Sequence, residues 1–288
     1  MEIPADHKKE FEFIQGLTAD LSEQVLIFPT SLNATMKIRR AITQDNISND
    51  MLARIISAEP VLSAQILKLS NSAAFNPTGK TNTELRTATM RLGFMKVKNL
   101  TIAVGMKQLT EHKDLNKDIS VLMEGLWNRS ARVSAFSSVL AKTYTKLSAE
   151  NAMLAGLLHD VGKFYILNRA SHYQALFTSQ RALWNLVDAW HSNIGAAILE
   201  NWAVSDDIRN AVQNFGNREY THRGSFDLTD VIFAADLLDA HFDERSKRKL
   251  NWDEVPIALT KFDLDEEKGE QLHVLMKAEL DTFLSVVS

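Results

Sequence analysis

The sequence predicts an all-α fold. Apolar residues recur at intervals of three and four along most of the chain, which is the spacing of one helix face, and no stretch alternates as a half-buried strand does. Only 5 prolines and 11 glycines occur, too few for a fold rich in strands and tight turns. We expect two helical subdomains, residues 1–115 and 116–288, because the polar run Glu111–Asp118 is the best candidate for a link.

Composition excludes several classes of protein. The 288 residues include no cysteine, so the chain has no disulfide framework and no thiolate ligand or nucleophile. No apolar run approaches the roughly 20 residues that span a membrane, and the N-terminus lacks the regions of a signal peptide. A net charge of −4 gives no overall attraction to nucleic acid. We therefore expect a cytoplasmic protein that binds neither nucleic acid nor membrane.

The first half is predicted to form about five to seven short helices, each with one apolar face. Proline suits the first turn of a helix, and polar clusters cap helix starts. Taken alone, this half indicates only a small helical bundle. Its expected landmarks are a first helix over residues 8–26, a break at Pro29 and Ser31, a capping cluster at 46–50, a helix start at Glu59-Pro60, a loop at 76–82 and a helix end at Gly93.

The second half is predicted to carry longer helices. After residue 118, one apolar helix stripe contains a single charge, Arg129, while Arg132 falls on the face expected to be in solvent. A buried charge is costly unless it is paired, so we expect Arg129 to have a partner. Further helices are expected after the capping residue Ser148 and from about residue 181 to 202.

The most informative run is Gly156–Lys163. His159 and Asp160 are adjacent in an apolar helix, and helix neighbours lie about 100° apart, so both side chains can lean toward one point. Imidazole nitrogen and carboxylate oxygen are good ligands for a divalent metal, and Lys163 would suit a phosphate. The plainer alternative is a partly buried His and an exposed Asp on a core helix. Gly156 and Gly162 each weaken a helix by about 1 kcal/mol, which indicates close approach of backbone or ligand.

Four short motifs occur in order: Ile55–Leu62 with its Glu59-Pro60, Ile66–Ala73 ending in Asn71-Ser72-Ala73, Ala88–Gly93, and His159-Asp160-Val161-Gly162-Lys163. In this order and spacing the chain resembles the HDOD family, HD-related output domains of bacterial signalling proteins, over residues 25–240. The resemblance implies a helical N-terminal subdomain packed on a subdomain like the HD metal-dependent phosphohydrolases. Asn71-Ser72 is expected to have a structural role at a helix end.

The resemblance also implies where site residues lie. Catalytic HD proteins carry a metal-binding His about thirty residues before the His-Asp pair, at the position of Arg129 here. A guanidinium cannot bind a metal but can pair with a carboxylate, so we expect Arg129 to pair with Asp160; the alternative is that it extends to solvent. Asp236 resembles the terminal Asp of the superfamily, with Asp239 as a rival. His191 is either an extra ligand or a hydrogen-bonded core histidine.

The implied ligand set is incomplete. His159, Asp160 and Asp236 remain, with His191 as a further candidate, but the first His is absent. Gln213-Asn214-Phe215 stands where many relatives have His-His. Three ligands could still hold a metal weakly, yet Arg129 would repel the cation. We therefore expect these residues to be vestigial metal ligands.

As a member of such a family, the chain is expected to be a bacterial signal-transduction or regulatory protein without catalytic residues or cofactor. It would bind a partner protein or a small ligand, such as a nucleotide or phosphate, at a site formed by Arg129, His159, Asp160, Lys163 and Asp236.

Two alternatives stay open. One is a metal-dependent, phosphodiesterase-like phosphohydrolase in which Fe, Mn, Zn, Ni or Mg activates water and Asp160 and Lys163 take part in catalysis. The other is a structural scaffold whose cleft is a relic. The basic run Glu244–Lys249 is expected to be a solvated loop. The sequence names no partner, pathway or oligomeric state.

Overall fold

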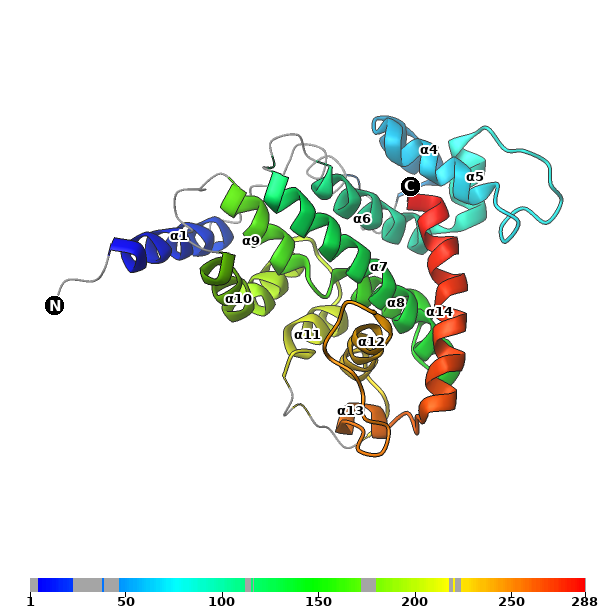
Figure 1. The fold of residues 1–288 in the computed structure, drawn as a ribbon. Coiled ribbons are helices and arrows are strands. Elements are labelled where there is room, and N and C mark those ends of the chain that lie inside the picture. Colours follow the sequence, from blue (N-terminus) through cyan, green and yellow to red (C-terminus); the bar gives the residue numbers. More distant parts are fainter. Residues whose placement is uncertain are drawn as a thin grey trace. The chain divides into compact units, whose positions relative to one another are not determined.

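The computed structural model describes residues 5–22, 38, 47–111, 115, 117–171, 180–217, 220 and 224–287. Within these residues the regular elements are helices and no strand occurs (Figure 1), so the predicted all-α fold is confirmed. In this part of the chain, no helix has both the length and the hydropathy to cross a membrane. The expected break at Pro29 and Ser31 lies outside the described residues.

Contacts between residues group the chain into two compact units. Unit 1 comprises Met1–Phe28 and Lys113–Glu279, and unit 2 comprises Pro29–His112 and Leu280–Ser288. The boundary between the units at His112 and Lys113 lies close to the expected link. The units differ from the expected subdomains, residues 1–115 and 116–288, because residues 1–28 group with the second half of the chain and residues 280–288 with the first. The first helix, α1 (Ala5–Ser22), belongs to unit 1, and the end of α14 (Glu266–Val287) belongs to unit 2.

Unit 2 is a small helical bundle. Leu52 and Ile56 of one helix and Leu62 and Ile66 of the next are fully buried in its core. Ser48 caps the first of these helices and Pro60 begins the second, as the sequence predicts. Besides the end of α14, its described helices are α3 (Asn49–Ser57), α4 (Pro60–Ser70), α5 (Leu85–Leu92) and α6 (Phe94–Thr110), with Gly93 at a φ of 77° between the last two.

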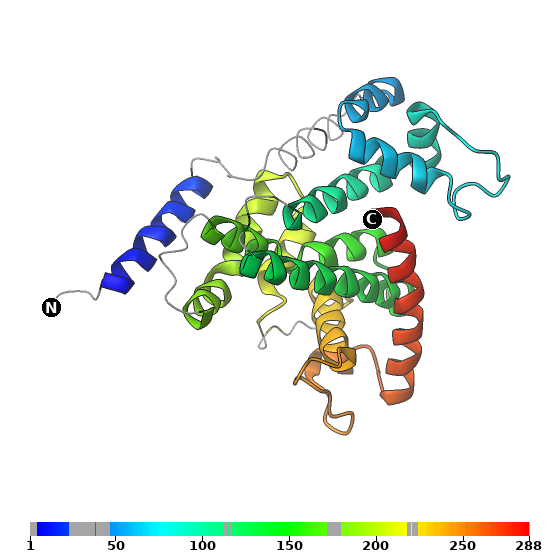
Figure 2. The same ribbon diagram turned by 45° about the horizontal axis from the view of Figure 1, so that its top comes forward.

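The connection between α4 and α5 extends from these helices as a long loop (Figure 2), and Asn71 closes it. The Asn71 side chain donates to the Asn82 carbonyl at 2.7 Å and accepts from the Asn82 backbone N–H at 2.7 Å. Arg91 adds a hydrogen bond to the Ser70 carbonyl at 2.9 Å. These contacts support the structural role expected for Asn71-Ser72.

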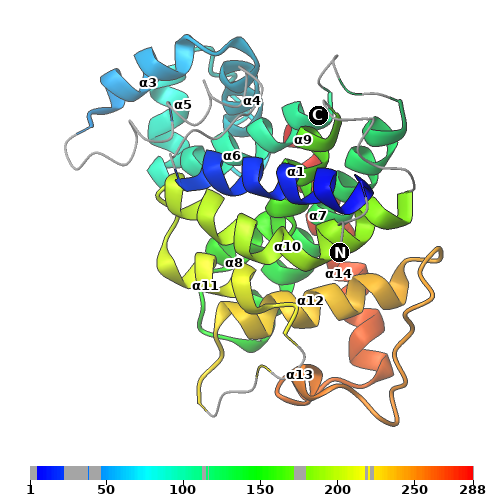
Figure 3. The ribbon, with the colours of Figure 1, turned by 90° about the vertical axis from the view of Figure 1, so that its left-hand side faces the viewer.

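Unit 1 is built around α7 (Lys117–Tyr144). This helix packs on α8, α9 and α12, while α10, α11 and α12 lie in succession side by side (Figure 3). Elements that are far apart in the sequence therefore meet at α7. The remaining helices are α8 (Ala149–Leu158), α9 (Val161–Ser171), α10 (Gln180–Asn201), α11 (Asp206–Asn214), α12 (Leu228–Phe242) and α13 (Ile257–Thr260).

Two glycines permit close helix crossings in unit 1. A Cβ atom at Gly156 would lie 2.6 Å from Ser137 Oγ and 2.8 Å from Ser134 Cα, where α8 crosses α7. A Cβ atom at Gly162 would lie 1.9 Å from the His191 carbonyl oxygen, where α9 crosses α10. The expected close approach is confirmed, and its partner includes protein backbone in both cases.

Candidate functional site

His159 and Asp160 lie at the corner between α8 and α9. The sequence predicts one continuous helix here, and this is wrong, because α8 ends at Leu158 and α9 begins at Val161. Both side chains are buried, with exposures of 1% for His159 and 0% for Asp160. The alternative of an exposed Asp on a core helix is therefore excluded. The corner turns both side chains toward the middle of α7.

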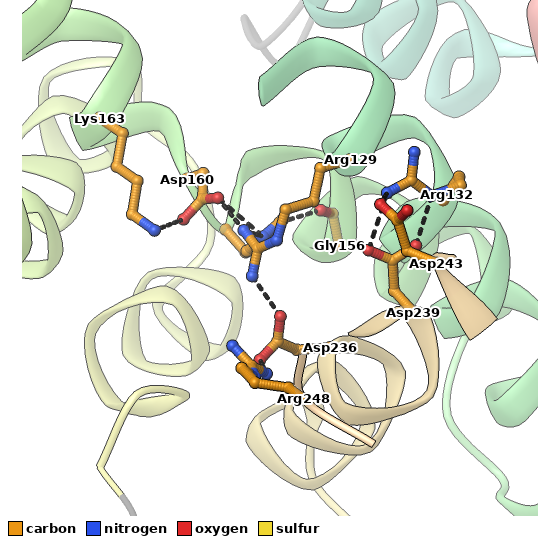
Figure 4. A network of polar contacts seen from close by, with 10 residues as sticks. Arg129, Arg132, Gly156, Asp160, Lys163, Asp236, Asp239, Asp243 and Arg248 are labelled. Atoms are coloured by element: carbon orange, nitrogen blue, oxygen red, sulfur yellow. Dashed lines mark hydrogen bonds and ion pairs between the residues drawn. The ribbon is translucent and has the colours of Figure 1, made fainter. Parts of the chain in front are cut away.

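Arg129, from the middle of α7, extends its guanidinium into this corner (Figure 4). Its Nη1 donates to Asp160 Oδ2, and its Nη2 donates to Asp236 Oδ1 on α12. Nη1 also lies 2.7 Å from His159 Nε2. The predicted Arg129–Asp160 pair is confirmed. The guanidinium thus joins α7, the α8–α9 corner and α12.

The contacts of His159 place a hydrogen on one of its two ring nitrogens. His159 Nδ1 lies 2.6 Å from the Gly156 carbonyl oxygen, which can only accept, so Nδ1 carries the hydrogen. Nε2 lies 2.7 Å from Arg129 Nη1 and 3.2 Å from Asp160 Oδ2. Histidines that bind metals use the same arrangement, with one ring nitrogen donating to a carbonyl and the other facing the ion. Here Nε2 faces the Arg129 guanidinium and the Asp160 carboxylate in place of an ion.

The charges of the cluster stabilise one another. Burial alone would raise the pKa of Asp160, but the Arg129 guanidinium, followed by His159 and the Lys163 ammonium, holds it well below its usual range. Burial likewise opposes ionisation of Asp236, but Arg129 and Arg248 lower its pKa. The two carboxylates in turn outweigh burial and raise the pKa of Arg129. All three groups are therefore charged at neutral pH.

A divalent ion does not fit this arrangement. The Arg129 guanidinium stands among the three residues that the family resemblance implies as metal ligands, and it bonds to all of them. Among the described residues, no group of three or more His, Cys, Asp or Glu is placed to hold a metal ion. The set His159, Asp160, Asp236 and His191 as vestigial metal ligands stays a prediction.

Arg132 corrects one prediction and resolves another. It is expected in solvent, and this is wrong: Nε donates to Asp239 Oδ1 at 2.5 Å, and Nη2 donates to Asp243 Oδ2 at 3.0 Å (Figure 4). Asp239 is the alternative candidate for the terminal Asp of the superfamily, but its carboxylate pairs with Arg132. Asp236 is the one that faces the His-Asp corner.

A pocket of about 560 Å³ lies beside the guanidinium. Lys163 lines it and also reaches back to Asp160, with Nζ 3.1 Å from Oδ1. The pocket is therefore charged where Arg129, Lys163 and Asp236 line it, and apolar along α12. Its lining includes Arg129, Lys163, His191, Phe215, Tyr220, Phe233, Asp236, Leu237, Ala240, Arg248, Lys249, Leu250 and Pro256.

Sequence reasoning missed Arg248. It belongs to the basic run expected to be a solvated loop, but its Nη2 donates to Asp236 Oδ2 at 2.7 Å, and 56% of its side chain is exposed. Asp236 thus accepts from two arginines, Arg129 of α7 and Arg248 of the loop after α12. No local pattern predicts this contact, because it depends on the path of the loop from Asp243 onward.

His191 lines the pocket. The alternative of a hydrogen-bonded core histidine finds no support at its Nδ1, and the alternative of an extra ligand stays a prediction. Its Nδ1 is buried, and no described residue forms a hydrogen bond with that atom. Its ring centroid lies 6.2 Å from that of Phe215. Burial, reinforced by the nearby Lys163 ammonium, lowers the pKa of His191 from 6.5 to about 4. His191 is therefore a neutral, polar wall of the pocket.

Lowering the pH from 6.5 to about 4 is expected to destabilise the protein through His191. In this window the unfolded chain binds a proton that the folded chain does not, so the free energy of unfolding decreases as the pH is lowered. The loss approaches about 3 kcal/mol if the full pKa difference is expressed. Urea unfolding of the unaltered protein and of a His191→Asn variant, across this pH range, should give a smaller slope for the variant. Equal slopes would contradict the prediction.

Comparison with known proteins places these observations in a family. The family model named HDOD domain matches residues 28–217, about two-thirds of the chain. The chain belongs to the HDOD family. A curated relative of this HDOD protein from Treponema pallidum (strain Nichols), described only as an uncharacterized protein, is 23% identical over 256 residues. That match covers 85% of this chain and 48% of the relative, so the chain spans about half of the relative's length.

Solved structures share the fold of this HDOD protein. A protein from Shewanella amazonensis SB2B, provisionally named a metal-dependent phosphohydrolase, has a TM-score of 0.68 and 24% identity, covering 95% of this chain and 99% of that one. A protein from Marinobacter aquaeolei VT8, provisionally named a signal transduction protein, has a TM-score of 0.63 and 17% identity, covering 98% of this chain and 66% of that one. At these identities the likeness shows the fold alone.

Proposed function

We propose that this HDOD protein is a non-catalytic regulatory module of signal transduction, whose site binds a small ligand or a partner protein. The observation that carries the proposal is the Arg129 guanidinium, bonded to His159, Asp160 and Asp236. In a hydrolase of this fold, a metal ion would supply the positive charge that holds such ligands together. Here the polypeptide supplies it.

The chemistry of a guanidinium explains why hydrolysis is not expected. Metal-assisted hydrolysis needs an open coordination position that binds water and lowers its pKa. Arg129 offers only N–H donors and has no position for a water ligand. It can neutralise the carboxylates, but it cannot generate a hydroxide at neutral pH. Loss of the first His therefore removes the nucleophile together with the metal.

The names of similar proteins support two candidate functions. The signal transduction name of the Marinobacter protein favours the regulatory module. The phosphohydrolase name of the Shewanella protein favours the alternative, a metal-dependent phosphohydrolase with a reduced ligand set. The position of Arg129 favours the first, because the same three side chains cannot bind the guanidinium and an ion at once.

Metal content and phosphodiesterase activity distinguish the two. Protein produced with Fe, Mn, Zn, Ni and Mg in the medium should contain no stoichiometric metal and should not hydrolyse bis(p-nitrophenyl) phosphate. An Arg129→His variant restores an imidazole beside His159, Asp160 and Asp236 and should gain metal. The control, Arg132→His, changes the neighbouring arginine of α7, which pairs with Asp239, and should gain none. Stoichiometric metal together with hydrolysis in the unaltered protein would overturn the proposal.

A further inference from the structure

We infer that the pocket beside Arg129 binds a small organic phosphate with an apolar ring, and that Arg248, not Arg129, contacts its phosphate. This inference rests on the proposed function and names the class of ligand that the module would take. The ligand site therefore differs from the one expected from the sequence. Arg129, His159, Asp160 and Asp236 hold the structure of the site together, while Arg248 and Lys163 bind the ligand.

The Arg129 guanidinium is occupied by contacts within the protein. Both of its Nη atoms donate to carboxylates, and Nη1 also contacts His159 Nε2. Asp160 is fully buried, so moving Arg129 toward a ligand would leave a buried carboxylate with a weaker set of partners. Removing one partner of a buried ion pair is strongly unfavourable. A ligand that required Arg129 would have to overcome that penalty.

Arg248 can change partners without such a penalty. With the described residues it makes one ion pair, from Nη2 to Asp236 Oδ2, and more than half of its side chain is exposed. When Arg248 turns to a ligand, Asp236 still accepts from Arg129 through Oδ1. Lys163 is in a similar position, because its partner Asp160 also keeps Arg129. Both cations can therefore bind an anion while the buried carboxylates remain paired.

The loop holds Arg248 at the pocket while this exchange takes place. Lys249 Nζ donates to the carbonyls of His241 at 2.6 Å and Asp243 at 3.0 Å, at the end of α12. The Leu250 backbone N–H donates to His241 Nδ1 at 3.0 Å. The backbone directly after Arg248 is thus fixed to α12. Rotation of the Arg248 side chain is sufficient to move its guanidinium from Asp236 to a ligand.

The charge of the lining favours a phosphate over a carboxylate. Among the described residues, the pocket is lined by four cationic side chains and one carboxylate, Asp236. Such an excess of positive charge favours a dianion, and a phosphomonoester carries about −1.5 to −2 charges at neutral pH. A guanidinium fork matches phosphate oxygens, and an ammonium group adds a compact charge. Arg248 and Lys163 supply one of each.

The apolar wall indicates a ligand larger than inorganic phosphate. Phe233, Leu237 and Ala240 lie on one face of α12 with Asp236 among them, and Leu250 and Pro256 line the pocket from the following loop. A volume of about 560 Å³ lies within the usual range for sites of small organic ligands. Inorganic phosphate would leave these apolar side chains uncovered. A flat or aromatic body attached to the phosphate would cover them.

Isothermal titration calorimetry tests the inference with AMP, GMP and phenyl phosphate as probes. Adenosine and inorganic phosphate serve as the two halves of AMP. Each probe is titrated into the unaltered full chain and into Arg248→Ala, Arg248→Lys and Arg245→Ala. Arg245 is the matched control, because it lies on the same loop and is 78% exposed but pairs with Asp243. Arg245 is not one of the described residues that line this pocket.

At least one phosphomonoester should bind more tightly than adenosine or inorganic phosphate. Arg248→Ala should weaken that binding by about tenfold or more, Arg248→Lys less, and Arg245→Ala by less than about twofold. The inference would be overturned if none of the three phosphomonoesters bound at millimolar concentration. It would also be overturned if Arg248→Ala and the unaltered protein bound them with equal affinity. Chromatography of the mixtures distinguishes failure of the proposed function from failure of the ligand site. Release of adenosine or phenol would contradict the non-catalytic function and leave the ligand site standing.

Discussion

Replacing Arg129 with methionine is expected to lower the free energy of unfolding by about 3–5 kcal/mol. The substitution removes the cation shared by Asp160 and Asp236, which are 0% and 6% exposed, and leaves their negative charges buried. Methionine is chosen because it fills a similar volume, so the lost charge dominates the effect. Urea or guanidinium unfolding at neutral pH, followed by circular dichroism, measures the change.

Double variants separate this charge effect from packing. Asp160→Asn removes the more buried of the two charges, so Arg129→Met combined with Asp160→Asn should be more stable than Arg129→Met alone. Arg245→Met is the control, since it removes an exposed arginine of the same unit and should change stability by about 0.5 kcal/mol or less. If Arg129→Met were as stable as that control, the guanidinium would not be holding the cluster together.

Replacing Gly162 with alanine is expected to cost about 3 kcal/mol or more. The new Cβ atom would lie 1.9 Å from the His191 carbonyl oxygen, which is backbone and cannot rotate away, so α9 and α10 must move apart. The same movement would displace Lys163 and His191, which line the pocket. Thermal and chemical unfolding measure the loss of stability, and a lower ligand affinity would accompany it.

Gly125 and Gly156 supply the comparison for this substitution. Gly125 lies in α7, and a Cβ atom added to it would meet nothing within 4 Å, so Gly125→Ala should be neutral or stabilising by up to about 1 kcal/mol. Gly156→Ala should be destabilising, because its Cβ atom would lie 2.8 Å from Ser134 Cα. If Gly162→Ala behaved like Gly125→Ala, the close crossing of α9 and α10 would be wrong.

Sequence reasoning was most successful where helix geometry determines the answer. Helical periodicity predicts the all-α fold, and a charge on the buried stripe of α7 predicts that Arg129 has a partner. The family resemblance, which implies a metal ligand thirty residues before the His-Asp pair, then indicates the corner that it reaches. The glycines at 156 and 162 predict close approach because each would otherwise be a poor choice in a helix.

The same reasoning failed where position depends on tertiary contacts. Arg132 follows Arg129 by less than one helical turn, and periodicity assigns it to solvent, yet α12 brings Asp239 and Asp243 to it. Arg248 lies in a polar run whose composition resembles that of any exposed loop. Its contact with Asp236 depends on how the loop returns along α12, which hydrophobic periodicity does not encode.

The cation at the centre of this cluster is part of the polypeptide. A bound ion stabilises a fold only to the extent that its free concentration exceeds its dissociation constant, and chelators or scarcity remove it. A guanidinium is present in every copy of the chain and keeps its charge across the physiological pH range. Under the proposed function, the junction of α7, the α8–α9 corner and α12 forms without a cofactor-loading step, and we expect its stability to be indifferent to the metal supply of the cell.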